Sequence, residues 1–233
     1  TGWFFDQRDN RAVIARLAVT YDNLAISLSG LGRFDAADSM YQQAIPLKLE
    51  AYGRDNPQTL LTMNNYARMK YFAGDVTGAE ALFKDVLAGR RVALGDSSDQ
   101  VAVTLNDLAR CRQARGQLAE AESLFAESKA LVTARLGPEA MNTNFVGSSL
   151  AQVHREQGQY ARAVGEFRAA RVHLGKIRGG EASPDLLWLN IEMAAALGAA
   201  GPSREADSLF AAIGGVPPAQ LSPRDRLRFN QYY

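Results

Sequence analysis

The side chains that most often carry covalent or acid–base chemistry are scarce in this chain. Cys111 is its one cysteine, and His154 and His173 are its two histidines among 233 residues. A cysteine nucleophile needs a base within about 3 Å, and nothing in the spacing brings these residues together. One cysteine also excludes an intrachain disulfide and a thiolate metal cage. We interpret Cys111 as a buried structural residue and expect no metal and no cofactor.

Other signs of catalysis are missing too. The sequence contains neither a GxxxxGK[ST] phosphate loop nor a GxGxxG motif. The acids Glu120 and Glu122 are interpreted as a solvated helix face, because no shared pocket is predicted that would shift a carboxyl pKa. His173 is interpreted as a solvated residue near a helix end. The chain is therefore not expected to be an enzyme.

Composition narrows the classes of partner. Hydrophobic residues make up 47% and charged residues 22%, which indicates a packed, soluble protein. The formal net charge of +1 gives no reason to expect nucleic acid. No apolar run approaches the roughly 20 residues of a membrane span, and the start lacks a signal peptide. We expect a cytoplasmic protein without membrane insertion. The abundance of alanine, and of arginine over lysine, indicates a bacterial source.

A repeat of about 42 residues organises the sequence. Glycines recur every 42 or 43 residues, at Gly32, Gly74, Gly116, Gly158 and Gly201. An alanine follows each glycine by five residues, at Ala37, Ala79, Ala121, Ala163 and Ala206. An aromatic residue comes four residues later, at Tyr41, Phe83, Phe125, Phe167 and Phe210. A large residue followed by alanine precedes each glycine, at Leu24-Ala25, Tyr66-Ala67, Leu108-Ala109, Leu150-Ala151 and Met193-Ala194. So many positions in register indicate five copies of one unit.

Each unit is predicted to contain two helices. The first helix is expected to start near a capping oxygen, a proline or an acid, at Asn56-Pro57, Ser98-Asp99, Pro138-Glu139 and Ser183-Pro184. It should end just before the glycine described above. The second helix should run to a further glycine, at Gly53, Gly95, Gly137 and Gly179. The small alanines would let two helix backbones approach closely. The sequence therefore predicts an all-α fold.

This order of residues resembles the tetratricopeptide repeat, in its 42-residue kinesin-light-chain type. The segments TLNDLARCRQARGQLAEAESLF (104–125) and TMNNYARMKYFAGDVTGAEALF (62–83) carry the resemblance. It implies a right-handed α-solenoid of about five stacked helical hairpins that forms one domain over residues 1–233. The expected repeats span residues 10–53, 54–95, 96–137, 138–180 and 181–215, and residues 222–233 would form a partial sixth helix. Both ends of the chain suggest a piece of a longer protein.

Two copies depart from the pattern. Gly147 stands where the other copies have the large residues Tyr21, Met63 and Leu105. The last copy has a short second helix, which the segment GGVPP (214–218) cuts off.

The resemblance also implies a concave groove, lined by the first helices, that holds a peptide. The expected groove residues are Asn23, Asn64, Asn65, Arg68, Tyr71, Asn106, Asp107, Arg110, Gln113, Ser149, Gln152 and Arg155. Asparagine can bridge a peptide backbone, and arginine favours a carboxylate. Tyr71 and its neighbour Phe72 could anchor an apolar side chain. The alternative is that the repeated asparagines are merely polar residues of a helix surface, or that they brace neighbouring repeats.

We therefore expect a non-catalytic scaffold that binds a protein or peptide partner. One alternative is a regulatory or sensory repeat region of a larger bacterial signalling protein, such as a kinase, ATPase or protease. A small-ligand receptor would need a closed pocket with convergent polar groups. Self-association through the terminal repeats is also consistent with apolar faces left open at the ends of a stack.

Overall fold

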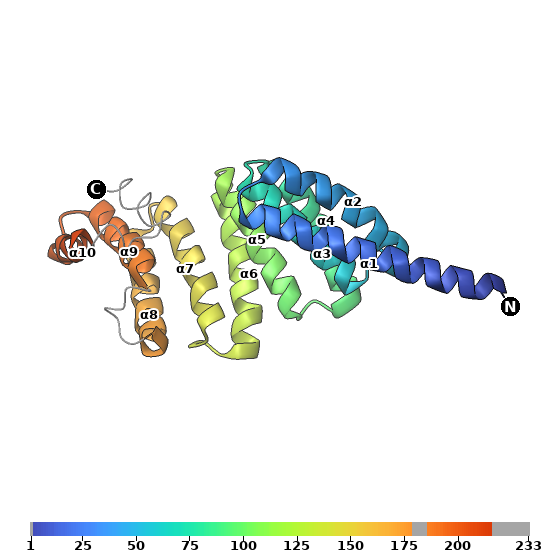
Figure 1. The fold of residues 1–233 in the computed structure, drawn as a ribbon. Helices are drawn as coiled ribbons and strands as arrows, with labels where there is room; N and C mark the ends of the chain where they lie inside the picture. The colour runs from blue at the N-terminus through green and yellow to red at the C-terminus, as the bar shows by residue number, and fades with distance from the viewer. Residues whose placement is uncertain (1, 179–185, 216–233) are drawn as a thin grey trace. The chain divides into compact units, whose positions relative to one another are not determined.

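The computed structural model describes residues 2–178 and 186–215, which form ten α-helices and no strand (Figure 1). The helices are α1 (Gly2–Gly30), α2 (Phe34–Tyr52), α3 (Pro57–Phe72), α4 (Val76–Leu94), α5 (Asp99–Ala114), α6 (Leu118–Leu136), α7 (Met141–Glu156), α8 (Tyr160–Arg178), α9 (Leu187–Ala200) and α10 (Arg204–Gly214). The all-α prediction is confirmed. The predicted helix over residues 222–233 lies outside the described residues.

The helices begin largely where the capping residues predict. Asn56 caps α3 by accepting a hydrogen bond from the Gln58 N–H at 2.9 Å, and Pro57 is the first helical residue. Ser98 caps α5 in the same way through the Val101 N–H. The α7 helix begins at Met141 without a side-chain cap, so the predicted start at Pro138-Glu139 is a few residues too early. The predicted start at Ser183-Pro184 lies outside the described residues.

The glycines of the repeat end the helices in the left-handed backbone region. Gly74 has φ 91°, follows the end of α3, and donates its N–H to the Tyr71 carbonyl at 3.1 Å. A side chain is strained at this φ value, whereas glycine adopts it freely. The helix ends were therefore predictable from glycine spacing. The short last helix is confirmed as well, since α10 has 11 residues where α8 has 19.

The repeated alanines and aromatic residues form the core. The alanines of both helices in each hairpin are buried, and the aromatic residues Tyr41, Phe83, Phe125 and Phe167 are at most 1% exposed. Tyr41 also contacts Tyr66 of the following hairpin, with ring centroids 5.2 Å apart. A methyl group lets two backbones approach, and the aromatic ring then fills the space beside the contact.

The chain divides into two compact units, unit 1 (Thr1–Gln117) and unit 2 (Leu118–Tyr233). In unit 1, each of the helices α1 to α5 packs against the next, and the first helices α1, α3 and α5 are neighbours in that order. In unit 2, the helices α6 to α10 pack in the same sequential way, and α7 neighbours α9. A single solenoid over residues 1–233 stays a prediction.

Ion pairs recur at one position of the repeat. An acid follows the buried alanine of the second helix, and it contacts a base 32 residues later in the next first helix. The pairs are Asp38–Lys70 at 3.3 Å, Glu80–Arg112 at 2.9 Å and Glu122–His154 at 3.2 Å. Each pair joins a second helix to the next first helix within one unit. These side chains therefore brace the stack in addition to its apolar core.

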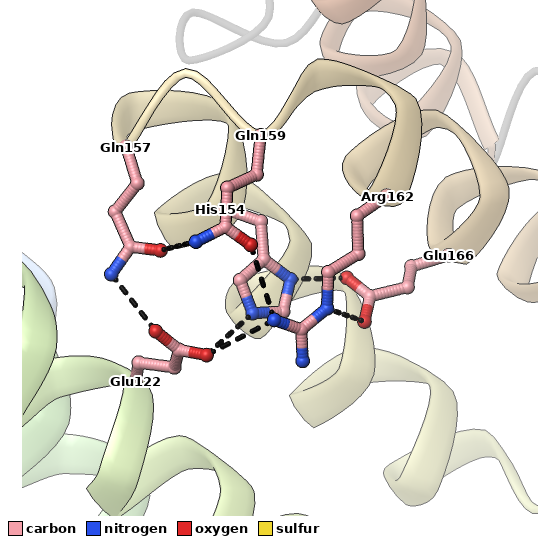
Figure 2. Close-up of polar contacts among 6 residues, drawn as sticks. All are labelled: Glu122, His154, Gln157, Gln159, Arg162 and Glu166. Carbon is pink, nitrogen blue, oxygen red and sulfur yellow. Dashed lines mark hydrogen bonds and ion pairs between the residues drawn. The ribbon is translucent and has the colours of Figure 1, made fainter.

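Figure 2 shows the Glu122–His154 pair and the polar residues around it. The His154 side chain is fully buried, and its Nδ1 lies 2.6 Å from Glu166 Oε2 while its Nε2 lies 3.2 Å from Glu122 Oε1. Both ring nitrogens can donate at once only when the ring is protonated. Three helices of unit 2, namely α6, α7 and α8, meet at this one imidazole. His154 is thus a structural residue.

The prediction that Glu122 is solvated is wrong. Gln157 donates a hydrogen bond to Glu122 Oε2 at 2.9 Å, and Arg162 donates to Oε1 at 3.2 Å. The Gln157 hydrogen bond, with His154 and Arg162, holds the pKa of Glu122 below its ordinary value, although burial opposes this. The three partners come from α7, the α7–α8 connection and α8, so inspection of α6 by itself could not find them.

We expect Gly74→Ala to destabilise unit 1 by about 1–2 kcal/mol, because alanine must adopt a left-handed backbone. Gly30→Ala is the matched control, since Gly30 has open space around its Cβ position and no positive φ. Urea unfolding followed by circular dichroism measures both variants. Equal stability of the two variants would contradict the assigned role of Gly74.

We expect the free energy of unfolding to fall more steeply with acid in the wild type than in Glu122→Gln. A carboxyl whose folded pKa is lowered contributes stability above its unfolded pKa, and this contribution is lost as the pH falls through the folded value. The difference between the two proteins at pH 7 should therefore shrink as the pH falls below the ordinary glutamate pKa of about 4.3. Glu139→Gln removes an exposed carboxylate of unit 2 and should keep the wild-type slope. Parallel curves for wild type and Glu122→Gln would refute the assignment.

Candidate functional site

The repeated asparagine position divides into a buried and an accessible residue on α3. Asn64 is 3% exposed, and its Oδ1 accepts a hydrogen bond from Arg90 Nη1 at 3.0 Å. The same Arg90 atom donates to Thr104 Oγ1 at 2.6 Å. Asn64 therefore joins α3, α4 and α5. For Asn64, this contact agrees with the alternative that the asparagine braces neighbouring repeats.

The preceding hairpin has a similar polar contact, which different residues form at the equivalent repeat positions. Asp22 stands 42 residues before Asn64 and lies 3.4 Å from Lys48 Nζ. The Thr62 hydroxyl donates to Asp22 Oδ2 at 2.7 Å. Lys48 is 2% exposed, so this pair is buried between α1, α2 and α3. Two consecutive joints of unit 1 are thus held by a polar triad.

Asn65, Arg68 and Tyr71 lie on the accessible side of α3. Asn65 is half-buried, and the Arg68 side chain is 52% exposed. Tyr71 packs edge-on against Phe72, with ring centroids 5.7 Å apart, and Phe72 is 57% exposed. These residues offer an amide, a guanidinium and an aromatic face to solvent.

A carboxylate on α5 faces this surface. Asp107 Oδ2 lies 3.9 Å from Arg68 Nε, beyond hydrogen-bond distance. Burial raises the pKa of the Asp107 carboxyl, and the charges of Arg68 and Arg110 offset only part of that effect. Asn106 and Arg110 are half-buried next to it. The α5 residues therefore form a partly buried charged layer beside α3.

The other expected groove residues are divided between the two units. Asn23 of α1 is exposed, and Gln113 of α5 is half-buried. In unit 2, the Ser149 hydroxyl donates to the Phe145 carbonyl of its own helix at 3.3 Å. Arg155 lies 3.4 Å from Glu192 of α9, and Gln152 is half-buried. Arg155 thus forms an ion pair between α7 and α9.

An apolar pocket opens beside the α3 residues of unit 1. Its volume is about 490 Å³, and residues of α1, α2 and α3 and the α1–α2 turn line it. The apolar lining includes Ile26, Phe34, Tyr41, Met69 and Phe72, and the polar lining includes Ser29, Asn65 and Arg68. Two of the predicted groove residues, Asn65 and Arg68, therefore stand at a pocket.

A repeated apolar position on the first helices was not anticipated from the sequence. Large apolar residues are exposed at one position of four copies, 42 residues apart, at Val19, Leu61, Val103 and Phe145. The Phe145 ring stacks on Trp188 within unit 2, with centroids 5.7 Å apart. The 42-residue spacing is visible in the sequence, but the expected groove positions were chosen mainly for their polar residues.

The residues expected to be inert behave differently from one another. Cys111 is fully buried, and burial raises the pKa of its thiol to about 12, so its expected burial is confirmed. His173 is 26% exposed and contacts Asn144 Oδ1 through Nδ1 at 3.1 Å, so the expectation of a solvated side chain is wrong.

Across the part of the chain that the structure describes, no cluster of three metal-ligating side chains occurs. None of the described helices is long and apolar enough to cross a membrane.

A family model described as the tetratricopeptide repeat matches residues 16–91, 64–134 and 100–171. No curated protein matches the chain. Solved structures do match, and they include nearly identical tetratricopeptide-like repeats of kinesin-light-chain type from Podosopora anserina. That likeness has 24% identity and a TM-score of 0.72, and it covers 86% of this chain and 94% of the other.

Two further structures are similar. BtubC (BKLC) from P. vanneervenii shares 20% identity at a TM-score of 0.72, with 97% of this chain and 93% of the other covered. YrrB, described as a tetratricopeptide protein with an unusual peptide-binding site, shares 13% identity at a TM-score of 0.52, with 92% of each chain covered. These likenesses confirm the tetratricopeptide-like solenoid fold. Because the family model covers well over half of the sequence, the chain belongs to the tetratricopeptide repeat family.

Proposed function

We propose that this chain is a scaffold that binds an extended peptide of a partner protein along α1, α3 and α5 of unit 1. Tetratricopeptide repeats are typically protein-interaction modules, and the proposal adds the place and the chemistry. The observation that carries it is the pocket of about 490 Å³ with Asn65 and Arg68 at its polar side. A pocket with apolar walls and a few placed polar groups is the usual form of a ligand site.

The apolar part of the pocket defines one feature of the peptide. Ile26, Phe34 and Phe72 present aliphatic and aromatic surface, and Phe72 is more than half exposed. A large apolar or aromatic side chain would bury this surface on binding, which is the kind of contact that dominates binding energy in interfaces. The exposed Leu61 and Val103 extend the apolar surface along neighbouring first helices.

The charged side of the pocket defines a second feature. Arg68 is half exposed, and its contact with Asp107 is longer than a hydrogen bond. Its guanidinium can therefore turn a planar pair of N–H groups toward a carboxylate of the peptide. Asn65 offers both a donor and an acceptor to the peptide backbone. The preferred peptide thus carries an acidic residue beside an apolar one.

The similar structures support the fold on which this proposal rests. YrrB is described as having a peptide-binding site, and that statement concerns YrrB. Its identity to this chain is 13%, so the fold, rather than any site residue, is what the two share. The buried Asn64 is left out of the proposed contact surface, because its oxygen already accepts from Arg90.

We expect Arg68→Ala and Phe72→Ala each to weaken peptide binding about tenfold, because each removes one of the two recognised features. The probe is a panel of fluorescent peptides in which one tryptophan or leucine stands beside one glutamate, measured by polarisation against the whole chain. Lys84→Ala removes an exposed cation of α4 that pairs with Glu80, and it should leave the affinity unchanged. If no peptide binds, or if Lys84→Ala weakens binding as much as Arg68→Ala, the proposal is wrong.

We expect alanine substitutions of the neighbouring residues Asn64 and Asn65 to have different effects on stability and on peptide binding. Asn64→Ala should lower the free energy of unfolding by about 1–3 kcal/mol, because it leaves a buried guanidinium without one of its acceptors. Asn65→Ala should change the stability by less than about 0.5 kcal/mol but should weaken peptide binding. Urea unfolding and the polarisation assay on both variants decide this. The reverse pattern would place Asn64, not Asn65, at the ligand.

A further inference from the structure

Unit 2 contains a pocket that the peptide proposal does not use. Its volume is about 300 Å³, and it lies among α6, α7 and α8. The residues that bear on its chemistry are Lys129, Asn144, Gly147, Glu166 and His173. The remaining lining includes Thr133, Thr143 and the small residues Gly165 and Ala169 of α8.

Two departures from the repeat create this pocket. Gly147 stands where earlier copies have Tyr21, Met63 and Leu105, so a large side chain is missing from α7. Lys129 stands where the earlier copies have Ile45 and Leu87. A Cβ atom built at Gly147 would lie 3.4 Å from Lys129 Cε and 3.5 Å from its Nζ. The ammonium group therefore lies beside the vacated position, where a core residue would otherwise be.

Lys129 has no counterion among the residues that the structure describes. It is half-buried, and none of the described carboxylates lies within 4.0 Å of its Nζ. Glu166 is the acid of the pocket, but its Oε2 contacts His154 at 2.6 Å and its Oε1 pairs with Arg162 at 3.7 Å. A partly buried cation without a partner is unfavourable. An anion in the pocket would remove that cost.

The position of His173 adds a second polar group with a defined orientation. Asn144 Nδ2 donates to the carbonyls of Pro138 at 3.3 Å and Ala140 at 2.9 Å, which fixes its Oδ1 as an acceptor. The contact of 3.1 Å between Asn144 Oδ1 and His173 Nδ1 therefore requires a proton on Nδ1. Among the residues that the structure describes, the group recorded near His173 Nε2 is Glu139 Oε1 at 3.9 Å, which is beyond hydrogen-bond distance. This atom is available to a ligand.

We propose that this pocket binds a small carboxylate, with Lys129 Nζ as its charged contact. The volume suits a ligand of few heavy atoms, since it lies at the lower end of ligand-pocket sizes. A carboxylate places negative charge beside Lys129, and a hydroxyl of the ligand can donate a hydrogen bond to His173 Nε2. The carboxylate can belong to a free small acid or to an acidic side chain of a bound protein. The site is separate from the unit 1 surface, and the two proposals fail independently.

The test is a titration of the ¹⁵N-labelled chain with succinate, followed by amide chemical shifts at constant ionic strength. We expect saturable shifts around Gly147 and His173 with a dissociation constant of about 1 mM. Succinamide, which has the same shape without charge, should not produce them. Lys129→Leu restores the residue type of Leu87, and it should weaken succinate binding about tenfold or more. Lys176→Gln removes an exposed lysine of the same unit and should bind as the wild type does.

Gly147→Met restores the residue type of Met63, and it should abolish binding by filling the pocket. If that variant does not fold, Gly147→Ala serves instead, because the flexible end of Lys129 is the nearest group to the added methyl. A blocked Gly-Glu-Gly peptide is the second probe. Tighter binding of that peptide than of succinate identifies a protein side chain as the ligand, and the reverse order identifies a free acid. Absence of saturable shifts with both probes, or unchanged affinity in Lys129→Leu, overturns the proposal.

Discussion

The close approach of helices at buried alanines is the constraint on which the rest of the structure depends. Ala67 of α3 and Ala79 of α4 have no exposed surface, and the same holds for their equivalents in the other complete hairpins. A methyl group is the largest side chain that such a contact admits without separating the backbones. The aromatic residue four positions after the second alanine then fills the space beside it.

The polar residues of the repeat divide into two groups because of that geometry. Those that point between neighbouring helices form hydrogen bonds or ion pairs with each other, such as Asn64 with Arg90 in unit 1 and Glu122 with His154 in unit 2. Those that point away from the joints remain accessible, as Arg68 does. A buried polar group needs a partner, whereas an exposed one does not. The same repeat position can therefore hold a polar bracing residue in one copy and an apolar core residue in another. Arg90 braces unit 1, and the buried Leu174 stands at the equivalent position of a later copy.

Local signals made much of the fold predictable. Asn56 and Ser98 cap helices through contacts two or three residues away, and Gly74 ends a helix through its own backbone. The errors arose where the partner is remote in sequence. Glu122 was taken for a solvated acid because its partners lie 32 to 40 residues away on other helices. His173 was misread for the same reason, since Asn144 is 29 residues away.

The sequence by itself determined the repeat, its two helices per copy and the family, because periodicity and caps act over short distances along the chain. Only the tertiary structure decided which polar residues remain accessible. Asn64 and Asn65 are adjacent and chemically identical, but successive residues of an α-helix point about 100° apart. One therefore turns into the joint between hairpins and the other toward the pocket of unit 1. Likewise, Gly147 and Lys129 are two separate departures in the sequence, and packing of α6 against α7 makes them one pocket.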